Sequence, residues 1–406
     1  MESRYVFLDI LKSALAGEAY EPREQITTEQ WGQILALARD HQLLPMVVDA
    51  CYRLPGLAGT ELLAAVRGNV RQQVFLQARK TGEFLLLYGK LREAGARPLV
   101  VKGIVCRSLY PQPDQRTSSD EDVLIRPEEF ERCHGALRAF GMEAGEAPEH
   151  FAAAYEIPYR KKGSPLLIEL HKTLFPQGSD AYGDLNGFFE EVHDRAVEEN
   201  VAGGRIMTLS ATDHLFYLIC HAFKHFLHGG FGIRQVCDIV LFARENEPRI
   251  HWAQVLENCE SIRAAKFAAS MFAIGKNHLG LEVKLPAFWP MDVDEMPMLE
   301  DLLDAGIYGG ADMDRKHSST MTLQAVARQK QGKDAGGGLI KSLFPKAASL
   351  ENRYPYLKKH PWLLPVAWVS RMAKFAAKGG SDAAANTVRI GKERIELLKQ
   401  YEILEK

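Results

Sequence analysis

Residues 97–125, RPLVVKGIVCRSLYPQPDQRTSSDEDVLI, contain the pattern from which the fold can be worked out. The apolar run 98–101 predicts a short buried strand, and the Lys-Gly pair that follows ends it. Residues 104–110 predict a turn or two of helix, after which comes a polar loop with two prolines. Residues 120–125, DEDVLI, then predict a second strand that begins with acidic residues.

Two carboxylates at the start of this second strand favour a metal site. Strand side chains alternate between faces, so Asp120 and Asp122 point the same way, about 7 Å apart. They repel each other unless a cation lies between them. Oxygen ligands of this kind suit Mg²⁺, which keeps waters and takes its other ligands from a substrate phosphate. An isolated Asp-x-Asp is usually a surface loop, but this one runs directly into an apolar strand.

A third carboxylate lies within the apolar run 166–171, LLIELH. A charge at Glu169 is costly there unless it has a partner. If this run forms a strand beside the one that carries Asp120 and Asp122, Glu169 completes an acidic cluster.

These residues together resemble the nucleotidyltransferases of the polymerase-beta type, in which a glycine, a helix, a strand with Asp-x-Asp and a later acid follow in order. The resemblance is closest to a bacterial group of uncharacterised nucleotidyltransferases and is most specific over residues 98–240. The matching residues are Val101-Lys102-Gly103, Tyr110, Arg116, Asp120-Glu121-Asp122-Val123-Leu124-Ile125, Ile168-Glu169-Leu170-His171, His221, His225, Ile233-Arg234 and Asp238-Ile239.

Two features depart from the pattern of that superfamily. Lys102-Gly103 stands where the superfamily has Gly-Ser or Gly-Gly, and the gap to the first aspartate is longer. Glu121 also replaces an apolar residue. We expect Glu121 to strain its strand if the side chain faces the core, and to be harmless if that face is open.

The chain is expected to have an α+β fold, in which a small mixed-sheet nucleotidyltransferase core lies at residues 97–209. Residues 1–96 and 210–406 are predicted to be helical. In the first region Thr28 is a candidate helix cap, and 61–94 is a long periodic stretch interrupted by three glycines. In the core, two runs around 155–170 predict a hairpin. Residues 206–209 predict a last strand at the edge of the sheet.

The resemblance implies a metal-dependent enzyme that moves a nucleoside monophosphate from a nucleoside triphosphate, with ATP as the expected donor, to an acceptor that the sequence does not identify. Asp120 and Asp122 would hold two Mg²⁺ or Mn²⁺ ions, and Glu169 would bind the ion that lowers the pKa of the acceptor hydroxyl. Gly103 would let the backbone approach the triphosphate. Further phosphate contacts are expected from three side chains, Lys102, Arg116 and Ser119.

Several polar residues of the later helices are candidates for contacts to phosphate or acceptor. His221 and His225 are spaced like the ligands of helical zinc sites, although the glutamate of His-Glu-x-x-His is missing. They are either core histidines or, with Arg234, residues that face the cleft. Arg234 and Asp238 could equally form a structural ion pair one helical turn apart. His171, which ends the Glu169 run, completes this set of candidates.

Composition limits the partners and the compartment. The 406 residues carry a net charge of −2, which gives no general attraction to nucleic acid. The basic and aromatic stretch 341–378 is nevertheless either a nucleic-acid or membrane patch or a helical tail packed on the body. The six cysteines include no Cys-x-x-Cys pair, and no signal peptide or transmembrane run is evident, so we expect a cytoplasmic protein.

A different class of function is also compatible with the sequence. The chain could keep the nucleotidyltransferase fold as a catalytically inactive binding or regulatory protein. Glu121 and the missing Gly-Ser motif support that alternative. Transfer of labelled nucleotide in the presence of Mg²⁺ separates the two.

Overall fold

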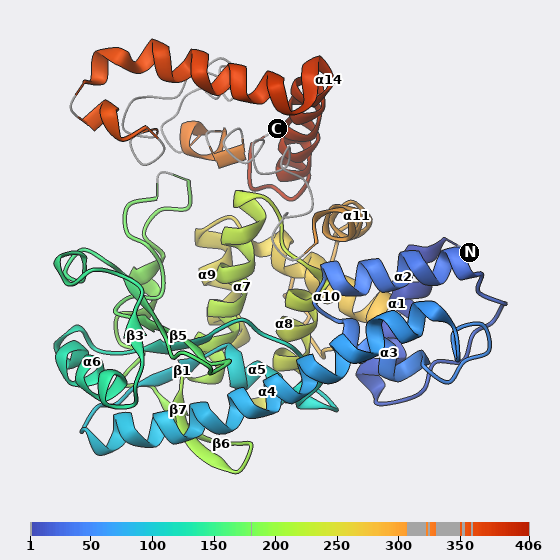
Figure 1. Ribbon diagram of the computed structural model, residues 1–406, viewed down its shortest axis with the longest axis horizontal. Coiled ribbons are helices and arrows are strands. Elements are labelled where there is room, and N and C mark those ends of the chain that lie inside the picture. The colour runs from blue at the N-terminus through green and yellow to red at the C-terminus, as the bar shows by residue number, and fades with distance from the viewer. Residues whose placement is uncertain are drawn as a thin grey trace.

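A seven-stranded mixed sheet forms the centre of the computed structural model (Figure 1). The structure describes residues 2–179, 181–306, 322–323, 325–329, 350, 354–358 and 360–405, with side chains left out at 355, 358 and 371–388. The strands are β1 (Leu99–Val101), β2 (Glu121–Leu124), β3 (Glu143–Ala144), β4 (Glu156–Arg160), β5 (Leu167–His171), β6 (Val197–Val201) and β7 (Gly204–Thr208). Their order across the sheet is β3-β4-β5-β2-β1-β7-β6.

The pairing of the strands confirms the predicted α+β class and corrects one strand. β2 and β5 run parallel, as do β1 and β7, while the remaining pairs are antiparallel. β4 and β5 form the predicted hairpin. The expected edge strand, β7, lies between β1 and β6, so β6 is the edge. The β6 segment, VEENV, is polar and half-buried, so its pattern does not predict a strand.

Four helices precede the sheet in the sequence; the first three pack against one another away from the strands, and the fourth runs along the sheet (Figure 1). They are α1 (Ser3–Ala16), α2 (Thr28–Asp40), α3 (Leu44–Cys51) and α4 (Glu61–Glu93). The cap of α2 is Thr27 rather than the expected Thr28, and Thr27 and Gln30 form a capping box. Helix α4 is unbroken across its three glycines, and a Cβ at Gly68, Gly82 or Gly89 would meet nothing within 4 Å. Glycine there costs helix propensity but relieves no clash.

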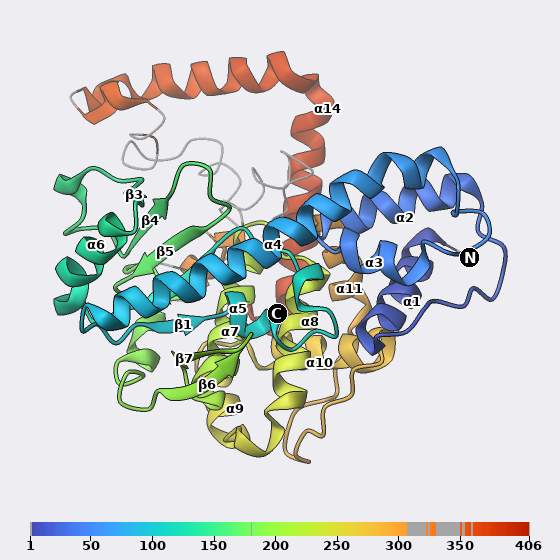
Figure 2. The same cartoon turned by 60° about the horizontal axis from the view of Figure 1, so that its bottom comes forward.

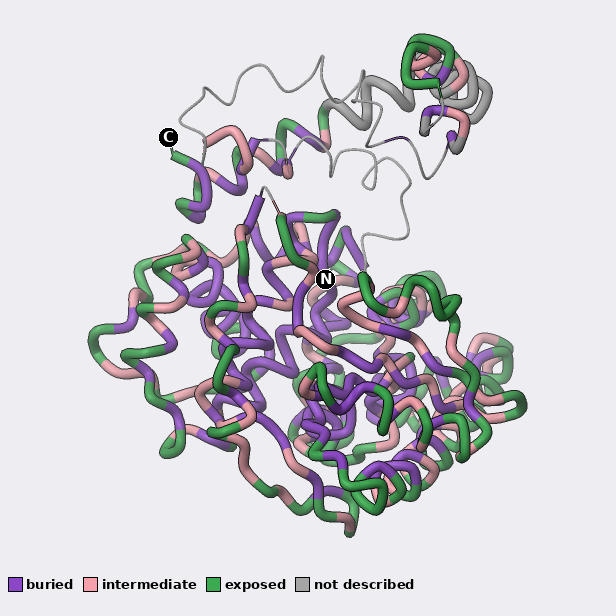
Figure 3. Tube along the Cα trace, turned by 90° about the vertical axis from the view of Figure 1, so that its left-hand side faces the viewer, coloured by how far each residue is buried: buried purple, intermediate pink, exposed green. Residues whose placement is uncertain are grey.

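Helices cover both faces of the sheet (Figure 2). α4 crosses the face on which Glu121 lies, and α7 covers the face on which Asp122 lies. The buried hydrophobic side chains form one large cluster, and in Figure 3 the buried stretches of the trace gather inside the main body. The other helices are α5 (Gly103–Arg107), α6 (Phe130–Ala139), α7 (Ala211–His228), α8 (Ile233–Glu245), α9 (Trp252–Ser261), α10 (Ala265–Leu279), α11 (Met296–Ala305) and α14 (Leu364–Gln400). Short 3-10 turns lie at Pro113–Gln115, Pro127–Glu129, Pro148–His150, Leu185–Phe189, Glu247–Arg249, Pro355–Lys358 and Pro361–Leu363.

The end of the chain returns to the body of the protein. The Tyr401 hydroxyl donates to the Asp294 carbonyl at 2.7 Å, and the Arg394 guanidinium donates to the Phe226 carbonyl. Much of the basic stretch 341–378 lies outside the described residues. Within the described part of the chain, no helix is long and apolar enough to cross a membrane. All six cysteines are buried free thiols.

The turn from β1 into α5 combines an unusual backbone conformation with a close side-chain contact. Lys102 has φ 57° and ψ −114°, outside the regions that a side chain favours. His214 on α7 holds this residue by accepting the Lys102 backbone N–H at 3.0 Å. Gly103 follows with φ +25°, and a Cβ there would lie 2.1 Å from Glu121 Oε2. The Lys-Gly pair therefore fits a turn that needs a glycine at its second position.

Glu121 fills the space that Gly103 leaves. Its carboxylate is fully buried, accepts the Ile104 N–H at 2.7 Å and binds Arg107 Nη2 at 2.8 Å. Lys80 Nζ of α4 lies 3.6 Å away. Burial raises the pKa of Glu121, but the two cations outweigh burial and hold the pKa below its usual range. The face is closed, yet these partners offset the cost of a charge in the core.

We expect Gly103→Ala to lower the free energy of unfolding by about 2 kcal/mol or more, because Glu121 is fixed by its partners and cannot move aside cheaply. Gly89→Ala on α4 is the matched control, and it should raise stability by about 0.5–1 kcal/mol because the site is open. Urea unfolding of both variants measures the difference. A Gly103→Ala protein as stable as the parent would contradict the tight turn.

Candidate functional site

The candidate site is built on two paired residues of neighbouring parallel strands. Asp122 on β2 lies opposite Glu169 on β5, and Val101 of β1 flanks Asp122 on the other side. Their carboxylates therefore project from the same face of the sheet. Ligand atoms of three residues, Asp122, Glu169 and His171, lie within 4.8 Å of one another. The structure thus brings together two of the three predicted catalytic acids.

Asp122 is the most deeply buried member of the site. Lys102 Nζ lies 2.9 Å from its Oδ2, and His171 Nε2 lies 3.2 Å from its Oδ1. Burial raises the pKa of Asp122, but Lys102 and His171 outweigh burial and hold the pKa well below its usual range. Asp122 is therefore ionised across the physiological pH range.

Glu169 lacks such compensation. Its side chain is 28% exposed, and its nearest basic group is His171 Nε2, 3.8 Å from Oε2. Burial, followed by the negative charges of Asp122 and Asp120, raises the pKa of Glu169 to about 7. A carboxyl group with this pKa is one whose ionised form would gain from an added cation.

Asp120 lies at the rim of the site. It directly precedes β2, is half-buried and accepts a 3.2 Å hydrogen bond from the exposed Ser119 hydroxyl. It is not one of the three residues whose ligand atoms cluster within 4.8 Å. The negative charge of Asp120 still acts on the cluster, because it helps raise the pKa of Glu169 and that of Lys102.

Helix α7 supplies the wall that faces the acids. His221 Nε2 lies 3.3 Å from Lys102 Nζ, and His225 Nε2 lies 3.3 Å from His221 Nε2. Burial and the nearby lysines lower the pKa of His221 well below its usual value and that of His225 to about 3, so both rings are neutral. His221 contacts Lys102 directly, and His225 contacts His221 rather than Lys102. Among the described residues, the ligand cluster does not include them.

Two further residues near the acids escaped the sequence analysis. Lys224, between the two histidines on α7, is largely buried, and burial lowers its pKa although Glu156 and Asp122 act in the opposite direction. Glu156 on β4 pairs with His171 across the hairpin. The sequence could have indicated Lys224 as a candidate site residue, because it lies between His221 and His225, which were already candidates. The sequence carried no signal for Glu156, whose role depends on how β4 pairs with β5.

Arg116 and Asp238 lie elsewhere than predicted. Both are buried, and the Arg116 guanidinium binds both carboxylate oxygens of Asp238, while the Tyr110 hydroxyl donates to Asp238 Oδ1 at 2.7 Å. Arg234 Nη1 donates to the Thr117 carbonyl, and the charge of Arg234 adds to that of Arg116 in lowering the pKa of Asp238. These contacts tie the loop before β2 to α8, so Arg116 and Asp238 are occupied by each other rather than by a phosphate.

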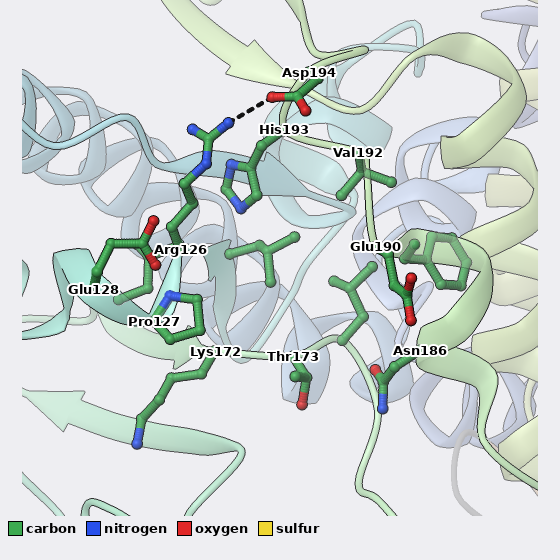
Figure 4. Close-up of a pocket in the computed structure, with 14 residues that line it drawn as sticks. Arg126, Pro127, Glu128, Lys172, Thr173, Asn186, Glu190, Val192, His193 and Asp194 are labelled. Atoms are coloured by element: carbon green, nitrogen blue, oxygen red, sulfur yellow. Dashed lines mark hydrogen bonds and ion pairs between the residues drawn. The ribbon is translucent and has the colours of Figure 1, made fainter.

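A pocket of about 290 Å³ opens beyond the carboxyl ends of β2 and β5 (Figure 4). An ion pair of 2.7 Å between Arg126 and Asp194 crosses one side, and His193 lies beside it. Leu124 and Lys172 in its lining are neighbours of Asp122 and His171 along the two strands, but the acids themselves do not line it. The pocket is therefore adjacent to the acidic cluster and separate from it.

The mixed sheet with its flanking helices is consistent with a nucleotidyltransferase-type fold. Residues 27–280 match the family described as uncharacterised nucleotidyltransferase, and the chain belongs to that family. No curated protein matches the chain. No solved structure matches it either.

The Arg116–Asp238 pair gives a direct test of how the loop before β2 is held. Asp238→Asn leaves Arg116 buried without a counter-charge, so the free energy of unfolding should fall by about 3–5 kcal/mol. Glu93→Gln, which removes an exposed partner of Lys90, should change it by less than about 0.5 kcal/mol. Urea unfolding measures both. Equal effects of the two substitutions would refute the anchoring role.

Proposed function

We propose that this protein transfers a nucleoside monophosphate from a nucleoside triphosphate to an acceptor, with release of pyrophosphate. The observation that carries the proposal is the direct pairing of Asp122 with Glu169 on parallel strands. It supports a shared cation site within a nucleotidyltransferase family fold. ATP is the expected donor, and the cytoplasm is the expected compartment.

The residues present fit a divalent metal ion. Two carboxylates and an imidazole with ligand atoms within 4.8 Å of each other form a donor set of the kind that binds such ions. Asp122 and Glu169 would hold the ion, with Asp120 at the rim for a second one. A bound Mg²⁺ or Mn²⁺ supplies charge stabilisation to the transferred phosphoryl group and activates the attacking hydroxyl.

The basic side chains near Asp122 would bind the triphosphate. Lys102 Nζ already lies in the site on Asp122, and its side chain is 16% exposed, so it can turn toward a phosphate oxygen. Lys224 adds a second cation on the α7 side. The neutral rings of His221 and His225 can donate or accept hydrogen bonds without adding charge. Ser119 is exposed at the rim, where its hydroxyl can reach a phosphate.

The Lys102–Asp122 contact also favours the second candidate, an inactive protein that binds nucleotide without turnover. An ammonium group 2.9 Å from Oδ2 holds a position on Asp122 that a metal ion would otherwise use. If Lys102 stays there when nucleotide binds, the acids cannot take part in transfer. Release of pyrophosphate separates the two candidates, because only the enzyme produces it.

The test uses purified protein with each of the four α-labelled nucleoside triphosphates, Mg²⁺ or Mn²⁺, and protein, RNA and small-molecule fractions of a cell extract. We expect label to pass to one fraction with release of pyrophosphate. Asp122→Asn should reduce transfer by about 10³-fold or more, because it removes a charge on which the reacting centre depends. Glu146→Gln, at an exposed carboxylate, is the matched control and should leave transfer unchanged.

Two results would count against the enzyme. Equal labelling by the parent and the Asp122→Asn protein would show that the label moves without this site. Tight nucleotide binding with no pyrophosphate from any fraction would favour the inactive candidate.

A further inference from the structure

His171 lies beside Asp122 and Glu169 in the acidic cluster, although a metal site made of carboxylates alone would not need a histidine there. It lies two residues after Glu169 on β5, so both side chains project from the same face of the sheet. Its Nε2 lies 3.2 Å from Asp122 Oδ1 and 3.8 Å from Glu169 Oε2. Only 5% of the side chain is exposed, so the ring faces the two acids rather than open solvent.

The other ring nitrogen also faces a carboxylate. Nδ1 lies 3.5 Å from Glu156 Oε2, and Glu156 is the residue that pairs with His171 across the β4–β5 hairpin. The ring of Tyr155 packs at 6.2 Å and limits how the imidazole can turn. Histidines that bind metals usually direct their second ring nitrogen at a carboxylate, which fixes the ring and makes the first nitrogen a better donor.

We infer that His171 Nε2 is a ligand of the metal site, that Glu156 is the residue that positions it, and that the site therefore prefers Mn²⁺ over Mg²⁺. Imidazole nitrogen binds transition-metal ions readily, whereas Mg²⁺ selects oxygen ligands. The inference rests on the metal-dependent function proposed above and names the residue that sets its ion preference.

The geometry does not favour the earlier assignment of His171 to phosphate or acceptor. The side chain of His171 is only 5% exposed, so its ring offers little surface to a phosphate or an acceptor. Nε2 of His171 lies within hydrogen-bond distance of Asp122 Oδ1, and Nδ1 lies 3.5 Å from Glu156 Oε2 without forming a hydrogen bond. A charged imidazolium that only stabilises Asp122 is the alternative, and it predicts no bond between nitrogen and metal.

The experiment is pulsed electron paramagnetic resonance of the full chain with Mn²⁺, without nucleotide, using protein labelled with ¹⁵N in its histidines. We expect hyperfine coupling from one histidine nitrogen to the bound ion, and its loss in His171→Gln. Titration should show that Mn²⁺ binds more tightly than Mg²⁺ in the parent, and His171→Gln should reduce that preference. His150→Gln, at an exposed histidine, is the control and should keep both properties.

Glu156→Gln tests the positioning residue and keeps the inference testable if His171→Gln fails to fold. It should retain the nitrogen coupling but weaken Mn²⁺ binding by about 10–100-fold, as loss of an outer partner does elsewhere. Mn²⁺ bound to the parent without nitrogen coupling, or no Mn²⁺ binding at all, would overturn the inference. Unchanged Mn²⁺ affinity in Glu156→Gln would remove Glu156 from it.

The outcomes also separate this inference from the proposed function. Nitrogen coupling without nucleotide transfer leaves His171 as a metal ligand in a protein that is not this enzyme. Transfer that depends on Asp122 but shows no nitrogen coupling leaves the enzyme and removes His171 from its metal site.

Discussion

The repulsion between Asp122 and Glu169 is the constraint on which this part of the structure depends. Their strands pair these residues directly, so two carboxylates share a poorly hydrated space. Asp122 is compensated by Lys102, whereas Glu169 is not, and its pKa rises to about 7 as a result of burial and of its acidic neighbours. A cation bound at this site would stabilise the ionised form of Glu169.

Strand β2 carries a second buried carboxylate, that of Glu121, on its other face. Glu121 points away from Asp122 and is fully buried against Arg107 and Lys80. Because Glu121 Oε2 uses the space in which a Cβ of residue 103 would lie, the glycine after Lys102 is required for packing as well as for backbone conformation. The turn that places Lys102 on Asp122 is therefore fixed from the opposite side of the sheet.

Local pattern was enough to predict the strands that carry the acids, because one is a short apolar run that begins with acidic residues and the other is an apolar run around Glu169. The same pattern favoured a position for Glu169 beside Asp122, since a charge in an apolar strand needs a partner. Contacts between distant segments that leave no such local signal could not be predicted. Arg116 binds Asp238, 122 residues away, and the β6 edge strand is polar. The position of His171 in the site depends on the register of β4 against β5.

The central claim is that a divalent cation binds between the carboxylates of Asp122 and Glu169. The most direct measurement is anomalous diffraction at the manganese absorption edge from crystals grown with Mn²⁺ and a non-hydrolysable nucleoside triphosphate. We expect an anomalous peak between the Asp122 and Glu169 carboxylates, with Lys102 turned from Asp122 toward the phosphates. A nucleotide-bound crystal with no peak there, and with Lys102 still on Asp122, would contradict it.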